Sequence, residues 1–176
     1  MVIALPYLEH YPDSLKNQIK KLIKEEKTGQ YLLSKYPKIH AVTSDKALYA
    51  YVMDFKSKHF RKSEAVCKVV YDGKISDIND ALGLHRISIK NYGGRLRSKN
   101  EIRIASLFKT VPEEFLRMIV VHELSHLKER GHTKAFYALC ENIEPRYHQL
   151  EFDTRVYLTH LEVFGKLYEL PKQKES

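Results

Sequence analysis

The chain has 176 residues, of which 43% are hydrophobic and 11% aromatic, so it can form one compact domain with a core and is not a disordered segment. Its net charge is +8, and residues 1–100 carry the excess, with 19 basic against 10 acidic side chains, which suits either ordinary solubility or a polyanionic partner. No apolar run is long enough for a membrane span or a secretory signal, and Cys67 and Cys140 are not spaced as metal ligands, so we expect a cytoplasmic protein with reduced thiols.

Helical spacing of apolar residues dominates the first part of the chain. It predicts helices over residues 14–27 and 45–60, and the valine-rich run 65–71 predicts a strand. Residues 1–62 are therefore expected to form an N-terminal helical segment that packs on a core unit of residues 63–176, which contains the motif described below.

Two more strands are predicted before the most informative helix. After a short helical turn over residues 77–82, residues 85–91 and 101–106 have the strand pattern and are separated by a two-glycine turn and a basic segment. The basic side chains allow three interpretations. Arg95, Arg97 and Lys99 could contact phosphate oxygens, the edge strand could hold an extended peptide, or the charges could only protect an exposed edge from aggregation.

The sequence His122-Glu123-Leu-Ser-His126 outweighs every other pattern in the chain. Its two imidazoles lie four residues apart, which on a helix places them on the same face one turn apart. Both rings can then bind one zinc ion, and the carboxylate of Glu123 can act as general base toward a water molecule at the metal.

The helix around this motif is apolar on nearly every side and is expected to be buried. A buried polar group without a partner costs roughly 2–7 kcal/mol, and a metal would satisfy all three polar groups of the motif at once. Residues 110–113 read as a capping box with Pro112 inside the first helical turn. The alternative is a chance match in which core histidines are simply hydrogen-bonded.

His132 is the expected third ligand. Gly131 can end the helix in the left-handed conformation, and a chain that turns back there carries His132 toward the other two imidazoles. The ten-residue offset from His122 equals that of the metzincin pattern. However, Glu129 stands where metzincins have glycine, and all three methionines lie upstream of the motif, so a true metzincin is not expected.

Other third ligands stay open. Glu141 or Glu144 could supply a thermolysin-like carboxylate, although a solvated helix face explains both residues. His132 itself could be an ordinary first-turn residue of the next helix.

Two helices are predicted after the motif, over residues 133–143 and 147–167, with Pro145 between them. Tyr147, His148 and Arg155 follow the ligand segment in a polar and aromatic cluster. They are candidates to stabilise a developing oxyanion or to contact substrate, although packing explains each of them equally well.

Several segments of the chain resemble the bacterial YgjP-like zincin family. The resemblance is carried by IVVHELSHLKERGHTKAFY at residues 119–137 and extends to residues 45–55, 81–85, 101–108 and 144–162. It implies an α+β, zincin-like metallopeptidase fold, in which a small sheet with a β-hairpin leads into the HExxH helix, with N-terminal helices and a long C-terminal helix. It also implies that His122, His126 and His132 bind the metal and that Glu123 is the base. The R-W-G-S segment of more distant relatives is absent, because the chain has no tryptophan.

Three functions are compatible with the sequence. The family label implies a zinc metallopeptidase in which metal-activated water attacks a peptide bond. The first alternative is a UTP pyrophosphatase that uses the same site, with the basic hairpin binding phosphates; Mg²⁺ would be the more usual ion for that reaction, although three histidines favour Zn²⁺. The second alternative is a nucleic-acid-binding module with a structural metal, against which the open fourth coordination position argues.

Overall fold

This computed structural model describes residues 3–75, 84–92 and 95–170, and it describes the backbone alone for 84–92 and 95–99. The described helices are α1 (Asp13–Lys24), α2 (Thr28–Lys35), α3 (Asp45–His59), α4 (Glu113–Ser125), α5 (Lys134–Ile143), α6 (Tyr147–Phe164) and the short 3-10 helices η1 (Pro6–Leu8) and η2 (Ser106–Thr110). The described strands are β1 (Val66–Asp72), β2 (Leu84–Tyr92) and β3 (Arg95–Ala105). The predicted α+β class is confirmed. Within these residues, no helix has both the length and the apolar character needed to cross a membrane.

The described strands form one mixed sheet in the order β1-β3-β2. β1 runs parallel to β3, with Val69 opposite Ile102, and β2 runs antiparallel to β3, with Tyr92 opposite Arg95. β3 starts six residues before the predicted strand of residues 101–106. The basic segment that the sequence pattern assigned to a connection is therefore strand, because pairing with β2 overrides its polar composition.

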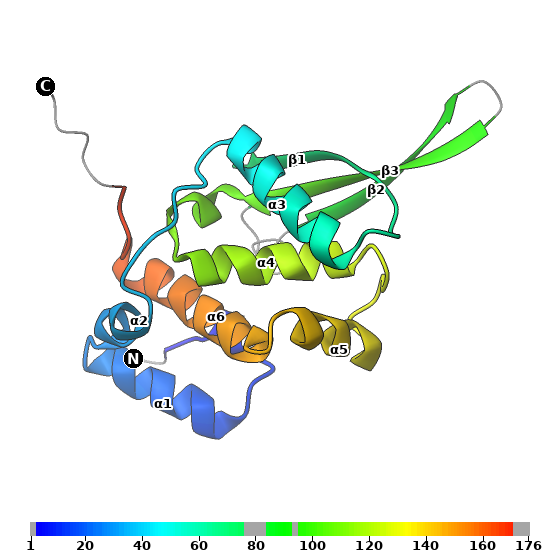
Figure 1. Cartoon of the computed structure of the whole chain (residues 1–176). Helices are drawn as coiled ribbons and strands as arrows, with labels where there is room; N and C mark the ends of the chain where they lie inside the picture. Colours follow the sequence, from blue (N-terminus) through cyan, green and yellow to red (C-terminus); the bar gives the residue numbers. More distant parts are fainter. Residues whose placement is uncertain (1–2, 76–83, 93–94, 171–176) are drawn as a thin grey trace, which may run out of the picture.

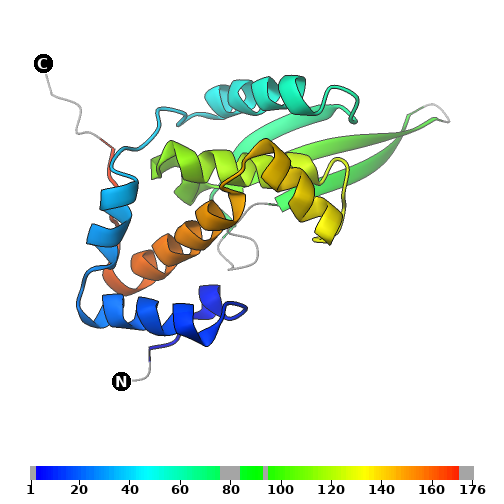
Figure 2. The same cartoon turned by 60° about the horizontal axis from the view of Figure 1, so that its bottom comes forward.

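Helix α4 lies in the middle of the molecule (Figure 1). The sheet and α3 lie on one side of it and α6 on the other, with α1 beyond α6, and both views agree on this order (Figure 2). Ten of its thirteen residues are buried, from Phe115 to Ser125 with the exception of Arg117. This confirms the prediction that the motif helix is buried all round.

The start of α4 differs from the prediction. Thr110 does not cap the helix, and Pro112 occupies the N-cap position rather than the first turn, with no side-chain cap. A tertiary contact replaces the capping box: Pro112 pairs with Ile39 in an isolated β-bridge, and the carbonyl of Val111 accepts a hydrogen bond from the amide of His40. The chain is thus extended where the capping box would need a turn.

The remaining predicted helices are recovered with shifted ends. The predicted helix 14–27 stops at Lys24, Glu26 adopts a positive φ of 55°, and a second helix that the sequence pattern did not indicate, α2, begins at Thr28. At the other end of the chain, Gly165 with φ 84° ends α6 three residues before the predicted boundary of residue 167. The predicted turn at 77–82 lies outside the described residues.

Candidate metal centre

The end of α4 brings the first two histidines together. His122 lies in the last turn of the helix, and His126 is its C-cap residue in right-handed helical conformation, with φ −64° and ψ −15°. The one-turn spacing that the motif needs is therefore kept although the helix already ends at Ser125. The expectation that the helix continues to Gly131 is wrong, and Gly131 does not adopt the left-handed conformation.

His132 joins the other two rings after an irregular turn that follows α4. The Nε2 atom of His132 lies 3.1 Å from that of His122 and 3.2 Å from that of His126, and the Nε2 atoms of His122 and His126 are 3.3 Å apart. We call these three atoms the histidine triangle. Among the described residues it is the one group of three or more potential ligands close enough to hold a metal.

The dimensions of the histidine triangle fit a tetrahedral metal. Ligand nitrogens at about 2.0–2.1 Å from a tetrahedral zinc ion lie about 3.3 Å from one another. The observed separations of 3.1–3.3 Å agree with that value. Three imidazoles leave the fourth tetrahedral position open for water or substrate, as in hydrolytic centres. The residues present therefore fit a divalent metal ion.

The outer hydrogen bonds orient the rings for this role. Nδ1 of His126 lies 3.0 Å from the carbonyl oxygen of Glu129, which can only accept, so Nδ1 carries the proton and Nε2 is left with its lone pair. Nδ1 of His122 lies 2.6 Å from the hydroxyl of Tyr147. Such partners of the second ring nitrogen fix the tautomer and the orientation of metal-binding histidines.

Phe136 supports the histidine triangle from one side. Its ring centroid lies 5.0 Å from that of His122, 4.6 Å from that of His126 and 5.0 Å from that of His132. Phe136 is fully buried on α5, which begins with Thr133 capping the amide of Phe136. One apolar ring therefore contacts all three imidazoles. The sequence pattern assigned Phe136 only to a buried helix face and gave no signal of this contact, because His132 lies before the N-cap of α5.

Burial controls the charge of the central groups. It holds the pKa of His122 well below its ordinary value, with further lowering by His126, His132 and Arg155, so the neutral, metal-binding form is favoured. Burial also raises the pKa of Glu123 well above its ordinary value. Oε2 of Glu123 is buried without a hydrogen-bond partner among the described residues. A buried carboxyl oxygen left without a partner is the exception in folded proteins and needs an explanation.

The alternative third ligands lie elsewhere. Glu144 is buried and contacts the guanidinium of Arg117, while Glu141 is exposed and lies 3.3 Å from Nε2 of His148. Neither belongs to the group of potential ligands around the histidine triangle. The solvated-face interpretation is wrong for Glu144, which joins α4 to the end of α5 through a partly buried ion pair with Arg117.

The predicted substrate residues fall into different environments. Tyr147 is fully buried, and its hydroxyl faces the Nδ1 edge of His122, on the opposite side of the ring from Nε2. In that position the hydroxyl can orient the imidazole of His122. A substrate contact of Tyr147 stays a prediction. His148 is exposed. Arg95, Arg97 and Lys99 lie on β3, but their side chains are outside the described part of the structure.

Arg155 lies on the same face of α6 as Tyr147, two turns further along. Its guanidinium contacts the carbonyl of Tyr7 at 3.2 Å and a carboxylate oxygen of Glu151 at 3.1 Å, while its buried Nε has no partner among the described residues. Its charge contributes to the lowered pKa of His122. The positive charge of Arg155 thus acts on the histidine triangle, while its guanidinium is held by Glu151 and by the backbone of Tyr7.

The metal-binding geometry occurs in a chain with a clear family relationship. Residues 78–153 match the family model described as YgjP-like, metallopeptidase domain. The UTP pyrophosphatase of Escherichia coli (strain K12) is 51% identical to this chain over 157 residues, which cover 89% of this chain and 94% of that protein. No solved structure matches the chain. The chain therefore belongs to the YgjP-like family of metal-dependent hydrolases.

Proposed function

We propose that this chain is a zinc-dependent hydrolase of nucleoside triphosphates that releases pyrophosphate. The observation that carries the proposal is the histidine triangle, with its open fourth position and the buried Glu123 next to His122 in the chain. The name of the relative that shares 51% identity supplies the substrate class, which the geometry alone leaves open. UTP is accordingly the first substrate to test.

The reaction joins water to the α-phosphorus and breaks the bond from that phosphorus to the oxygen that bridges to the β-phosphate. A bound divalent ion would supply Lewis-acid stabilisation of the phosphoryl oxygens and would make water more acidic. Glu123 would accept the proton that the attacking water loses and pass it on to the products. His122, His126 and His132 would hold the ion, and Tyr147 would keep His122 in place.

Arg155 is the described cation best suited to a phosphate group near this centre. Its charge already acts on His122, and its side chain is 18% exposed and held by Glu151, so its guanidinium is placed to attract a phosphate group near the centre. It stays a prediction that phosphate groups also contact Arg95, Arg97, Lys99 and His148.

Zinc is proposed over magnesium because three imidazole nitrogens suit zinc, whereas magnesium prefers oxygen ligands and octahedral geometry. We also propose a zincin-like fold, because the chain resembles the YgjP-like family. An antiparallel pair of strands, β2 and β3, precedes the motif helix α4, which supports this proposal. The division into residues 1–62 and 63–176 and the cytoplasmic location stay predictions.

Peptide hydrolysis, the first expectation from the sequence, becomes the second candidate. It is favoured by the description of the family domain, whereas the curated relative carries the name of a pyrophosphatase. The same histidine triangle and Glu123 would serve a peptide carbonyl equally well. A nucleic-acid-binding module with a structural metal is disfavoured, because structural zinc sites normally use four protein ligands.

A side-by-side substrate assay tests the proposal. Purified protein is analysed for metal content and then incubated with UTP, the other nucleoside triphosphates and a peptide library, before and after chelation and with zinc, manganese or magnesium returned. We expect release of UMP and pyrophosphate that is lost on chelation and restored best by zinc.

The Glu123→Gln variant links that activity to the site. It should bind the same amount of metal and lose about 100-fold to 10,000-fold in turnover, the usual contribution of a general base. Glu114→Gln on the same helix is the matched control, because the Glu114 side chain makes no hydrogen bond or ion pair within the described residues. Peptide cleavage that depends on Glu123, without pyrophosphate release, would overturn the proposal in favour of the second candidate.

A further inference from the structure

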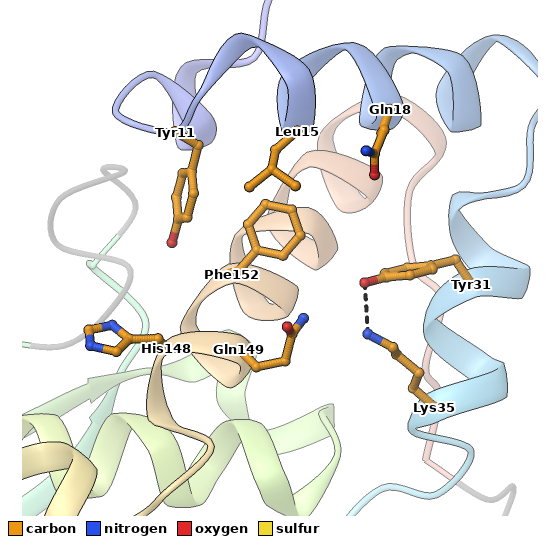
Figure 3. A pocket seen from close by; sticks show the side chains of 8 residues that line it. All are labelled: Tyr11, Leu15, Gln18, Tyr31, Lys35, His148, Gln149 and Phe152. Atoms are coloured by element: carbon orange, nitrogen blue, oxygen red, sulfur yellow. Dashed lines mark hydrogen bonds between the residues drawn. The ribbon is translucent and has the colours of Figure 1, made fainter.

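A hollow of about 380 Å³ lies between α1, α2 and α6 (Figure 3), and none of the three histidines of the histidine triangle lines it. Side chains of all three helices and of Tyr11, just before α1, point into it. Its volume lies within the range of roughly 300–1,000 Å³ that is typical of small-molecule sites. The residues proposed for chemistry do not line this hollow, with the exception of the predicted substrate residue His148.

The walls of the hollow combine flat rings with amide groups. Tyr11 and Phe152 form an edge-to-face pair with ring centroids 5.0 Å apart, and Leu15 lies beside them. Gln18 projects from α1 and Gln149 from α6 (Figure 3). Mostly apolar walls with a few polar groups that fix orientation are the usual composition of a ligand site.

The two amides differ in what they can still bind. Gln149 donates from Nε2 to Asp153 at 3.0 Å, which fixes its orientation and leaves its carbonyl oxygen as an acceptor. Gln18 makes no hydrogen bond within the described residues and offers both a donor and an acceptor. A glutamine amide can pair with the edge of a nucleobase through two parallel hydrogen bonds, and aromatic side chains stack on base faces.

The charge of the hollow argues against a phosphate-binding site. Lys35 at its rim lies 3.1 Å from the buried carboxylate of Asp153 and 2.8 Å from the hydroxyl of Tyr31, so its charge is already paired. The hollow therefore suits a neutral group with polar edges, and anionic groups would be better placed toward Arg155.

The hollow is linked to the histidine triangle by two short series of ring contacts. The ring of His148, at the edge of the hollow, lies 5.5 Å from that of Tyr137, which lies 6.2 Å from that of His132. His148 also lies 5.6 Å from the ring of Tyr147, whose hydroxyl contacts His122. The edge of the hollow at His148 is thus separated from the histidine triangle by a single layer of tyrosine rings.

We propose that this hollow binds the nucleoside part of the substrate, the base and its sugar, while the phosphates extend toward Arg155 and the histidine triangle. The inference rests on the proposed function and adds a base-recognition site to it. Phe152 and Tyr11 supply the apolar faces, and Gln18 and Gln149 supply the hydrogen bonds to the base.

Two inhibitors divide the substrate into its parts and test this site. Uridine carries the base and sugar without phosphates, and inorganic tripolyphosphate carries the phosphates without the nucleoside. Their inhibition constants against UTP hydrolysis are measured for the wild type, for Gln18→Ala and for Leu15→Phe, which narrows the hollow. Asn17→Ala is the matched control, because Asn17 is an exposed neighbour on α1 that does not line the hollow.

We expect Gln18→Ala to raise the inhibition constant of uridine and the KM for UTP about threefold to tenfold, the usual effect of losing one hydrogen bond, with kcat and the tripolyphosphate constant unchanged. Leu15→Phe should act in the same direction, and Gln18→Ala decides the outcome alone if the larger side chain impairs folding. A wild type that hydrolyses UTP, with variants that leave uridine inhibition unchanged or shift both inhibitors equally, overturns the nucleoside site. A wild type that releases no pyrophosphate from UTP overturns the proposed function itself.

Discussion

Two groups of buried polar side chains contact α6, and they differ in how far their hydrogen-bonding capacity is filled by the chain. Around Asp153, the carboxylate accepts from the hydroxyls of Tyr31 and Tyr36, both at 2.6 Å, and from two further donors. These are Lys35 at 3.1 Å and Gln149 at 3.0 Å. This group, which we call the Asp153 cluster, ties α2 to α6.

The histidine triangle has the reverse arrangement. Three imidazole Nε2 atoms lie within 3.1–3.3 Å of one another, and the neighbouring Glu123 has a buried oxygen without a partner among the described residues. Closely spaced lone pairs and an unpaired buried oxygen are costly in a low-dielectric interior. Buried polar side chains thus occur in two arrangements. In the Asp153 cluster the carboxylate is fully hydrogen-bonded and joins two helices. Around the histidine triangle the chain leaves polar atoms without partners among the described residues, which suits a ligand from outside the chain.

Removing a ligand from the histidine triangle should have the largest effect. His132→Ala leaves two imidazoles, and we expect metal affinity to fall by more than about 100-fold, beyond the effect of losing an outer-shell partner, with loss of hydrolysis. The measurement is a competition titration with a chromogenic chelator. The exposed His10→Ala serves as control. If instead Glu141→Ala or Glu144→Ala releases the metal and His132→Ala does not, the third ligand is misassigned.

The Asp153 cluster should respond through stability rather than metal binding. Asp153→Asn keeps the shape but removes the charge from four donors, and we expect a loss of about 3 kcal/mol in the free energy of unfolding. For a chain of this size that corresponds to a melting temperature lower by about 6–12 °C. Asp54→Asn, which removes an exposed ion pair with Lys58, should cost less than about 1 kcal/mol. Weaker metal binding by the folded Asp153→Asn variant would contradict the separation of the two groups.

Tyr147 lies on α6 like Asp153 but contacts the histidine triangle, and its loss should have an intermediate effect on metal binding. Tyr147→Phe removes the hydroxyl from Nδ1 of His122, and we expect metal affinity to fall about 10-fold to 100-fold while kcat at saturating metal changes less. Tyr137→Phe is the matched control, since its ring lies near His132 but its hydroxyl makes no hydrogen bond within the described residues. Equal metal affinities for the two variants would show that the hydroxyl only fills space.

A third buried polar group, His40, should produce a small pH dependence. Its Nδ1 accepts from the amide of Val42 at 2.9 Å, its Nε2 donates to the carbonyl of Phe108 at 2.7 Å, and burial lowers its pKa. The folded protein therefore holds a neutral ring, while the unfolded chain takes up a proton near pH 6.5. The stabilising contribution is complete above that pH and is lost as the pH falls from there toward the lowered folded-state pKa.

Urea unfolding at pH 7 and pH 5 measures this contribution. His40→Asn should be less stable at pH 7 and should lose less stability between the two values than the wild type, by at most about 1.4 kcal/mol per pH unit. The exposed His10→Asn should leave the difference unchanged. An identical difference for His40→Asn and the wild type would remove His40 from the acid sensitivity of the fold.

Much of this fold could be predicted from the sequence because apolar spacing follows burial. The pattern indicates α3, α5 and α6 because one face of each meets the core. It does not indicate α2, in which only Thr28 and Leu32 are buried and whose position depends on the Asp153 cluster. It also gives the wrong start for α4, because a contact with Ile39, far away in the chain, decides the conformation there.

The candidate site divides in the same way. The spacing of His122 and His126 is local, so the motif by itself is enough to predict that the two rings are close. The position of His132 depends on an irregular turn after α4. A turn at Gly131 and the family resemblance predict it, but the left-handed conformation expected of Gly131 is not the one the structure has. The contact of Tyr147 with His122 joins residues 25 positions apart and depends on how α6 packs beneath α4, which no local pattern contains. The roles of all these residues in binding and catalysis stay predictions.

The placement of His132 outside α4 has a mechanical consequence. Two of the three imidazoles belong to the end of one helix, and the third precedes the start of the next, with only a short irregular connection between them. An ion bound there would link the end of α4 to the segment before α5 and restrain the relative motion of the two helices. Slower protease cleavage between residues 127 and 133 would then report that the ion is bound, without any substrate being present.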